Sequence, residues 1–160
     1  GAMLKEYTHI LPPGDRPGAS AFVSKIKDIS EFLMALGPIP PKHPIPIKAT
    51  YHDACHLCHA QQIRLQPRQL LSMIPGLELV PLEESELCCG AAGTYNLTQP
   101  EMSERLGRRK MDNIQATGAQ VVATGNVGCI LQIARKIKER GSTMEVVHPV
   151  DLLDRAYRGE

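Results

Sequence analysis

The most informative segment of the sequence reads Gln120-Val121-Val122-Ala123-Thr124-Gly125-Asn126-Val127-Gly128-Cys129. Its first half is short, apolar and β-branched, which predicts a buried strand over residues 120–124. The glycines that follow predict a tight turn, and residues 127–140 have the length and apolar spacing of a helix. A strand, a glycine turn and a helix in this order are typical of a parallel α/β sheet.

The same alternation of strand and helix runs through most of the chain. Further strands are predicted at residues 45–51, 77–82 and 144–147, and further helices at residues 67–74 and 100–116 and from Pro149 onward. Thr98 and Glu101 have the spacing of a capping box, and Gly118 and Gly141 stand where two helices should end. We therefore expect an α/β fold with a mostly parallel sheet flanked by helices.

The chain is expected to divide near residue 46. Apolar residues spaced three and four apart predict one amphipathic helix over residues 19–36. Five prolines between positions 38 and 46 exclude regular helix and predict an extended linker. Residues 1–46 are thus interpreted as a helix and a Pro-rich linker, and residues 47–160 as a cysteine-rich α/β domain.

The amino-acid composition excludes several classes of function. Lys and Arg number 18 against 17 Asp and Glu, and there is no Trp, so neither general nucleic-acid binding nor a base-stacking surface is expected. No apolar run approaches the roughly 20 residues of a membrane span. Five cysteines in 160 residues do not suit a small secreted disulfide scaffold, which leaves metal or redox chemistry in a reducing cytoplasm.

A basic cluster on the predicted helix 100–116 has an ordinary explanation. Arg105 and Arg108 stand four residues after Glu101 and Glu104, so ion pairs along a solvated helix face account for much of it. Arg109 and Lys110 are assigned to the same solvated face.

Four cysteines follow the ends of three predicted strands: Cys55, Cys88, Cys89 and Cys129. The carboxyl ends of parallel strands meet at one edge of a sheet, so these thiols can converge in one crevice. Free cysteines are also common as small buried apolar residues. The glycine-rich runs at residues 90–93 and 125–128 favour a binding site instead, because exposed backbone amides there could stabilise thiolates.

Three motifs contain these cysteines: Asp53-Ala54-Cys55-His56, Cys88-Cys89-Gly90 and Gly125-Asn126-Val127-Gly128-Cys129. Their order and spacing resemble the cysteine-rich CCG domain of heterodisulfide reductase subunits and of iron-sulfur subunits of flavin-linked 2-hydroxy-acid dehydrogenases. Within that family, the segment from Tyr51 to Leu57 looks most like the carboxyl-terminal half of glycolate oxidase iron-sulfur subunits. The resemblance covers nearly the whole chain, including residues 1–7.

The resemblance implies that Cys55, Cys88, Cys89 and Cys129 ligate an iron-sulfur cluster. The family pattern ends in two cysteines separated by two residues, and Asn126 stands where the first of them would be. That departure speaks against the five-cysteine noncubane cluster and favours an ordinary 4Fe-4S centre. Residues expected around the ligands are His56, His59, Gly90 and Asn126.

Two alternatives stay open at this stage. The same four thiolates could form a structural zinc site at a subunit interface. A thiol-disulfide domain could instead cycle Cys88 with Cys89, or Cys55 with Cys58. Cys58 is not a cysteine position of the motif and is interpreted as a packing residue or spare ligand. For His52, His56 and His59, hydrogen bonding within the loop is favoured over metal ligation.

The resemblance also implies a role in a larger assembly. The chain would be an electron-transfer domain of a flavin-dependent 2-hydroxy-acid dehydrogenase such as glycolate dehydrogenase, not catalytic by itself. FAD would be held on a partner subunit, and electrons would pass to a quinone or other acceptor. A cytoplasmic location follows, with partner subunits able to hold the domain at the inner face of the membrane.

Overall fold

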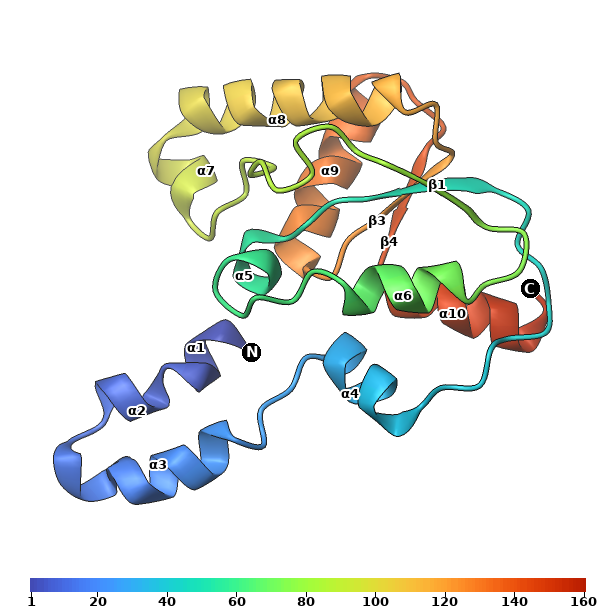
Figure 1. The fold of residues 1–160 in the computed structure, drawn as a ribbon. Coiled ribbons are helices and arrows are strands. Elements are labelled where there is room, and N and C mark those ends of the chain that lie inside the picture. Colours follow the sequence, from blue (N-terminus) through green and yellow to red (C-terminus); the bar gives the residue numbers. More distant parts are fainter.

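A computed structural model describes residues 1–160 and contains one four-stranded parallel sheet (Figure 1). Its strands are β1 (Lys48–Tyr51), β2 (Glu78–Val80), β3 (Val121–Ala123) and β4 (Glu145–Val147), in the spatial order β2-β1-β3-β4. Ala49 pairs with Leu79 on one side and with Val121 on the other. The α/β prediction is confirmed, and the sheet is entirely parallel.

Helices connect and flank the strands. They are α1 (Ala2–Lys5), α2 (Tyr7–Ile10), α3 (Arg16–Val23), α4 (Ile29–Leu36), α5 (Cys55–Cys58), α6 (Gln66–Ser72), α7 (Tyr95–Thr98), α8 (Pro100–Ala116), α9 (Val127–Glu139) and α10 (Pro149–Arg158), with a 3₁₀ turn at Pro13–Asp15. None of these helices combines the length and the hydrophobicity that crossing a membrane requires.

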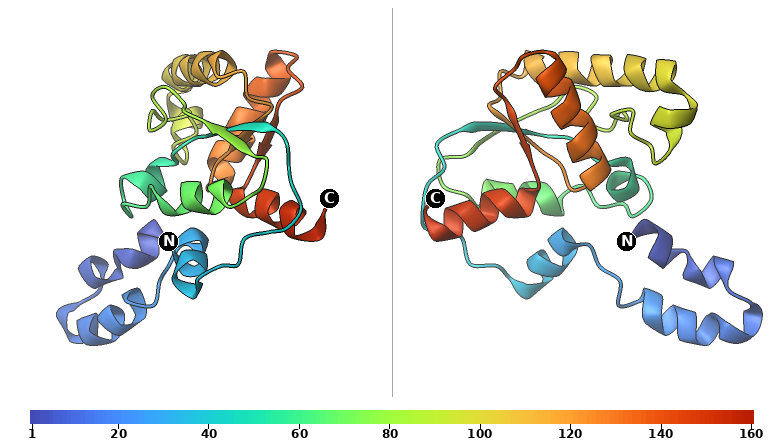
Figure 2. Two further views of the ribbon diagram at one scale, coloured as in Figure 1. Left: turned by 45° about the vertical axis from the view of Figure 1, so that its right-hand side comes forward. Right: turned by 180° about the vertical axis from the view of Figure 1, so that it is seen from behind.

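Each face of the sheet carries its own core (Figures 1 and 2). Side chains alternate along a strand, so neighbouring residues such as Val121 and Val122 enter opposite cores. One core joins the sheet to α6 and α10, with Leu33 and Met34 of α4 packed against it. The other joins the sheet to α8 and α9, and it contains Cys89 and Cys129. Cys89 and Cys129 thus lie on the face of the sheet that α8 and α9 cover.

The single helix predicted for residues 19–36 is wrong, because the chain forms α3 and α4 with a break at residues 24–28. The side chain of Asp28 accepts from the amide of Ser30, and Glu31 accepts from the amide of Asp28, which makes a capping box. This reciprocal cap starts a new helix after Asp28, so the helix is interrupted there although the apolar spacing continues along the sequence. Phe22 and Phe32, expected on one buried face, are 43 % and 48 % exposed.

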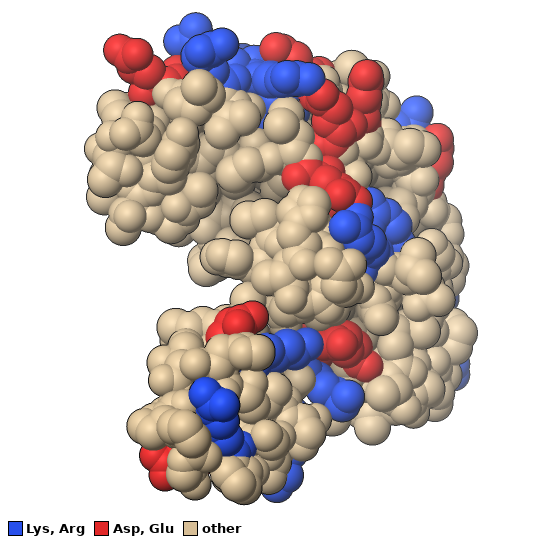
Figure 3. Space-filling view, turned by 60° about the vertical axis from the view of Figure 1, so that its left-hand side comes forward, with Lys and Arg blue, Asp and Glu red and all other residues tan.

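Helices α1 to α3 extend away from the sheet in all three views of Figures 1 and 2. They pack on each other, with the rings of Tyr7 and Phe22 stacked at 5.7 Å. The surface is hollowed between these helices and the part of the molecule that carries α7 and α8, and few charged side chains line the hollow (Figure 3).

Two of the predicted helix ends are confirmed and one helix start is corrected. Gly118 and Gly141 follow α8 and α9 with φ of +63° and +61°, a conformation that suits glycine. The predicted capping box at the start of α8 is absent, since the N-cap is Gln99 and its side chain accepts no hydrogen bond from the first turn. Thr98 instead donates its hydroxyl to the carbonyl of Thr94, within the preceding turn α7.

Candidate metal centre

The four cysteines that follow strand ends meet at the carboxyl edge of the sheet. Cys55 opens α5 just after β1, Cys88 and Cys89 lie in the loop after β2, and Cys129 is in the first turn of α9. All four line one cavity of about 40 Å³. The rest of its wall consists of His52, His56, Ala91, Ala92, Gly93, Asn126 and Gly128.

The thiols of three cysteines influence one another's ionisation. Hydrogen bonding to Cys89, together with burial, holds the pKa of Cys88 well above its usual value, and hydrogen bonding to Cys129 raises the pKa of Cys89 to about 11. Without metal, both thiols are therefore protonated at pH 7, and metal binding must displace their protons.

Backbone geometry of the loop after β2 directs amides at the sulfurs. The amide of Gly90 donates to the Cys88 sulfur at 3.3 Å. Gly90 has a φ of +92°, and a Cβ at this position would collide with the carbonyl oxygen of Ser103 in α8. The hydroxyl of Ser103 in turn donates to the Gly90 carbonyl at 2.8 Å. Helix α8 thereby fixes the loop that carries the adjacent cysteines.

Asn126 has a structural role where the family motif has a cysteine. Its side-chain oxygen accepts from the amide of Cys129 at 3.2 Å and caps α9. Asn126 lines the same cavity as Cys129.

His52 lies closer to the thiols than the sequence predicts, since the sequence favours His56 and His59 as neighbours of the ligands. One ring nitrogen of His52 lies within 4.8 Å of the sulfurs of Cys89 and Cys129. The residue is 1 % exposed, and burial lowers its pKa to about 3. The alternation of side chains along a strand could have predicted this position of His52. His52 follows β1 two residues after Thr50, so both side chains point away from the core that contains Ala49 and Tyr51.

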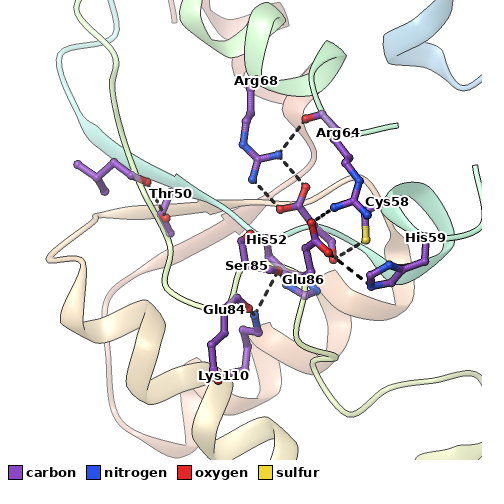
Figure 4. A network of polar contacts seen from close by, with 12 residues as sticks. Thr50, His52, Cys58, His59, Arg64, Arg68, Glu84, Ser85, Glu86 and Lys110 are labelled. Carbon is purple, nitrogen blue, oxygen red and sulfur yellow. Dashed lines mark hydrogen bonds and ion pairs between the residues drawn. The ribbon is translucent and has the colours of Figure 1, made fainter. Parts of the chain in front are cut away.

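The carbonyl of Ser85 connects His52 to α8 (Figure 4). It contacts the Nδ1 atom of His52 at 3.1 Å and accepts from the Lys110 ammonium at 3.3 Å and from the amide of Asp53 at 3.1 Å. Lys110 also donates to the carbonyl of Glu84 at 2.5 Å. Its assignment to a solvated face is wrong, because its side chain passes into the interior and is 1 % exposed. Burial lowers the pKa of Lys110 to about 8, so it remains mostly cationic at pH 7.

Cys58 and His59 lie outside the cavity. The Cys58 sulfur, one ring nitrogen of His59 and a carboxylate oxygen of Glu86 lie within 4.8 Å of one another. Glu86 is ion-paired with Arg64, whose positive charge opposes a metal ion there. The Cys58 thiol points to the carbonyl of Asp53 at 3.9 Å, and burial raises its pKa (Figure 4).

The donors around the cavity fit a soft metal. Four thiols and an imidazole nitrogen are the ligand types of zinc and iron-sulfur centres. The imidazole Nε2 of His52 is buried without a hydrogen-bond partner, which is the mark of a missing ligand atom. The present volume of about 40 Å³ suits a single ion, and a four-iron cluster would require the cavity to widen.

The comparison with protein families agrees with this geometry. The family described as "CCG: Cysteine-rich domain" matches residues 49–134, which include all four cysteines of the cavity. The chain belongs to the CCG cysteine-rich domain family. The resemblance inferred from the motifs is thereby confirmed.

Relatives of this CCG domain include components of several oxidoreductases. It is 40 % identical, over 96 % of its length, to the "Probable glycolate oxidase iron-sulfur subunit" of Bacillus subtilis (strain 168). It is 34 % identical, over 96 % of its length, to "Lactate utilization protein A" of Shouchella clausii (strain KSM-K16). Identity is 37 % over 82 % of the chain with a component of "Fumarate reductase (CoM/CoB)" from Methanothermobacter marburgensis.

The CCG domain corresponds to only part of these proteins. It spans 36 % of the Bacillus subtilis relative, 65 % of the Shouchella clausii protein and 27 % of the Methanothermobacter marburgensis protein.

Proposed function

We propose that this CCG domain binds a 4Fe-4S cluster through Cys55, Cys88, Cys89 and Cys129 and transfers electrons within a 2-hydroxy-acid dehydrogenase complex. The observation that supports it is the meeting of these four cysteines, from three separate segments of the chain, around one cavity. A relative described as an iron-sulfur subunit of glycolate oxidase supports the choice of metal and of reaction. FAD on a partner subunit would oxidise the hydroxy acid, with a quinone or similar acceptor downstream.

The chain's own residues would hold and neutralise such a centre. A bound cluster would supply one-electron chemistry, accepting and releasing single electrons. Four thiolates bring a net negative charge, which the amide of Gly90 and the buried cation of Lys110 offset. Asn126 supplies a helix cap in place of a fifth thiolate, which favours a four-ligand cluster.

A second, larger groove gives partners an approach to the centre. It measures about 470 Å³ and shares five wall residues with the thiol-lined cavity, namely His56, Ala91, Gly93, Asn126 and Gly128. Leu131 on this groove is 66 % exposed. We expect the flavin subunit or the electron acceptor to dock here, in the cytoplasm or at the inner face of the membrane.

The decisive experiment compares two cysteine variants. The domain is purified and reconstituted with iron and sulfide without oxygen, and iron, sulfide and zinc are counted per chain alongside the electron paramagnetic resonance (EPR) spectrum. We expect four iron atoms in the wild type, loss of the cluster in Cys89→Ser and full retention in Cys58→Ser, because Cys58 lies outside the cavity. Equal loss in both variants would contradict the ligand assignment.

A structural zinc site is the second candidate, and the compactness of the donors favours it. Donor atoms of His52, Cys89 and Cys129 within 4.8 Å of one another, around 40 Å³, suit one tetrahedral ion. The count of iron, sulfide and zinc per chain decides between the cluster and the zinc site, since a zinc site would hold one zinc and no iron. Thiol-disulfide exchange is less favoured, because a raised pKa leaves Cys89 mostly as the unreactive thiol.

A further inference from the structure

His52 carries a buried nitrogen that nothing in the protein satisfies. Its Nε2 atom has no hydrogen-bond partner, although the residue is only 1 % exposed. Most buried polar atoms in folded proteins have a hydrogen-bond partner, so a bare nitrogen in the interior calls for an explanation. The ring lines the same cavity as the four cysteines, beside the sulfurs of Cys89 and Cys129. The cavity is therefore the space in which a partner for Nε2 would lie.

The surroundings of the ring fix which nitrogen carries its proton. A carbonyl oxygen can only accept, so the contact between Nδ1 and the Ser85 carbonyl requires a proton on Nδ1. Lys110 and the amide of Asp53 hold the same carbonyl in place. In the neutral ring, Nε2 is then a bare lone pair. A ring nitrogen anchored through its other N–H to a carbonyl is the usual arrangement of a metal-ligating histidine.

We propose that Nε2 of His52 is a ligand of the metal centre, on the side of the cavity formed by Cys89 and Cys129. This inference rests on the proposed function only in requiring that the site binds a metal. Metal–sulfur and metal–nitrogen bonds of about 2.3 and 2.0 Å place neighbouring tetrahedral donors about 3.5–3.8 Å apart. One ring nitrogen of His52 and the sulfurs of Cys89 and Cys129 now lie within 4.8 Å of one another, so the donors need to move by only about 1 Å.

A nitrogen ligand would alter the properties of the centre. Imidazole is neutral, whereas a thiolate carries a negative charge, so ligation by His52 adds a donor without adding negative charge around the metal. Centres with histidine ligands have higher reduction potentials than those with cysteine alone. Cys55 and Cys88, which are the two half-buried thiols of the set, are the candidates for the remaining ligand positions.

The test detects nitrogen at the metal directly. The full chain is loaded without oxygen, once with iron and sulfide and once with Co²⁺ alone, and ¹⁴N coupling is measured by pulsed EPR on the reduced cluster and on the cobalt protein. We expect the coupling of a bound imidazole in the wild type, its loss in His52→Gln, and its retention in the matched control His59→Ala, which removes a ring outside the cavity. We also expect His52→Gln to weaken Co²⁺ binding at least about tenfold.

A second measurement does not depend on the variant folding. Wild-type protein labelled with ¹⁵N-histidine is followed by NMR before and after Zn²⁺ addition. The Nδ1–H tautomer of His52 before addition, and a large shift of Nε2 after it, would support the ligand. Metal bound without ¹⁴N coupling, or with an unmoved Nε2 resonance, would overturn the ligand and leave the proposed function standing. A wild type that takes up neither iron with sulfide nor cobalt would overturn both.

Discussion

Asp53 next to β1 is the buried carboxylate that anchors the loop of the first cysteine. Burial favours a raised pKa, but two hydrogen bonds from Arg68, at 2.7 and 2.6 Å, outweigh it and lower the pKa. Removing one partner of a buried pair leaves the other charge uncompensated. We expect Asp53→Asn to lower the free energy of unfolding of the reduced, metal-free protein by about 2–4 kcal/mol in urea titrations.

A matched control separates this effect from charge removal in general. Asp154 pairs with Arg158 one helical turn away on the exposed face of α10. Asp154→Asn should cost less than about 0.5 kcal/mol. Equal costs at the two positions would contradict the role assigned to the pair of Asp53 and Arg68.

Glu104 on α8 predicts a specific acid dependence of stability. Hydrogen bonds from Lys136 and Arg108 lower its pKa to about 2, against 4.5 in the unfolded chain. A depressed pKa stabilises the folded state above pH 4.5, and the contribution is lost as the pH falls from 4.5 toward 2. Urea titrations across this window should show a smaller loss of stability on acidification for Glu104→Gln than for wild type. Glu101→Gln, which removes an exposed carboxylate of the same helix, should leave the wild-type slope unchanged.

Among the elements, the contact between the Cys88–Cys89 loop and α8 is the tightest constraint on the site. Gly90→Ala would place a methyl group against the Ser103 carbonyl in a backbone conformation that L-residues avoid. We expect metal content to fall sharply, with a loss of several kcal/mol in stability. Gly93→Ala has a similar positive φ but open space around it, so only about 1–2 kcal/mol of strain and near-normal metal content are expected. Similar metal content in the two variants would contradict this role of Gly90.

The start of α9 gives a prediction about Asn126. Asn126→Ala removes the cap and should lower the free energy of unfolding by about 1 kcal/mol, while Asn126→Asp, which can still accept from the amide of Cys129, should retain it. Thermal unfolding of the metal-free protein measures both. An Asn126→Ala variant with the same free energy of unfolding as the wild type would show that the side chain does not cap α9. Its position in the cavity would then need another explanation.

For the molecule as a whole, a metal at the centre would cross-link three segments that follow β1, β2 and β3. A ligand that binds only the folded state adds about 2.7 kcal/mol at a hundredfold excess over its Kd. For a chain of this size, calorimetry should then show the midpoint of thermal unfolding rising by about 5–10 °C with metal and returning after chelation. Cys58→Ser should show the same rise, and Cys89→Ser none.

The alternation of strands and helices was readable because it depends on local patterns. Apolar segments bounded by turns located all four strands to within a few residues, and α8 occupies the predicted residues 100–116. The break between α3 and α4 was missed because one capping residue, Asp28, outweighs the periodicity around it. Lys110 was misassigned because sequence spacing alone does not say which face of a helix meets the sheet.

Sequence by itself determined that four cysteines follow the ends of three parallel strands, and parallel strands bring such positions to one edge. Tertiary structure alone decided what surrounds them. The Ser85 carbonyl joins His52, 33 residues away, and Lys110, 25 residues away, so the orientation of the unpaired nitrogen depends on the packing of a loop between β1 and α8. No local pattern encodes such a contact, because its partners are set by how the segments pack and not by their own periodicity.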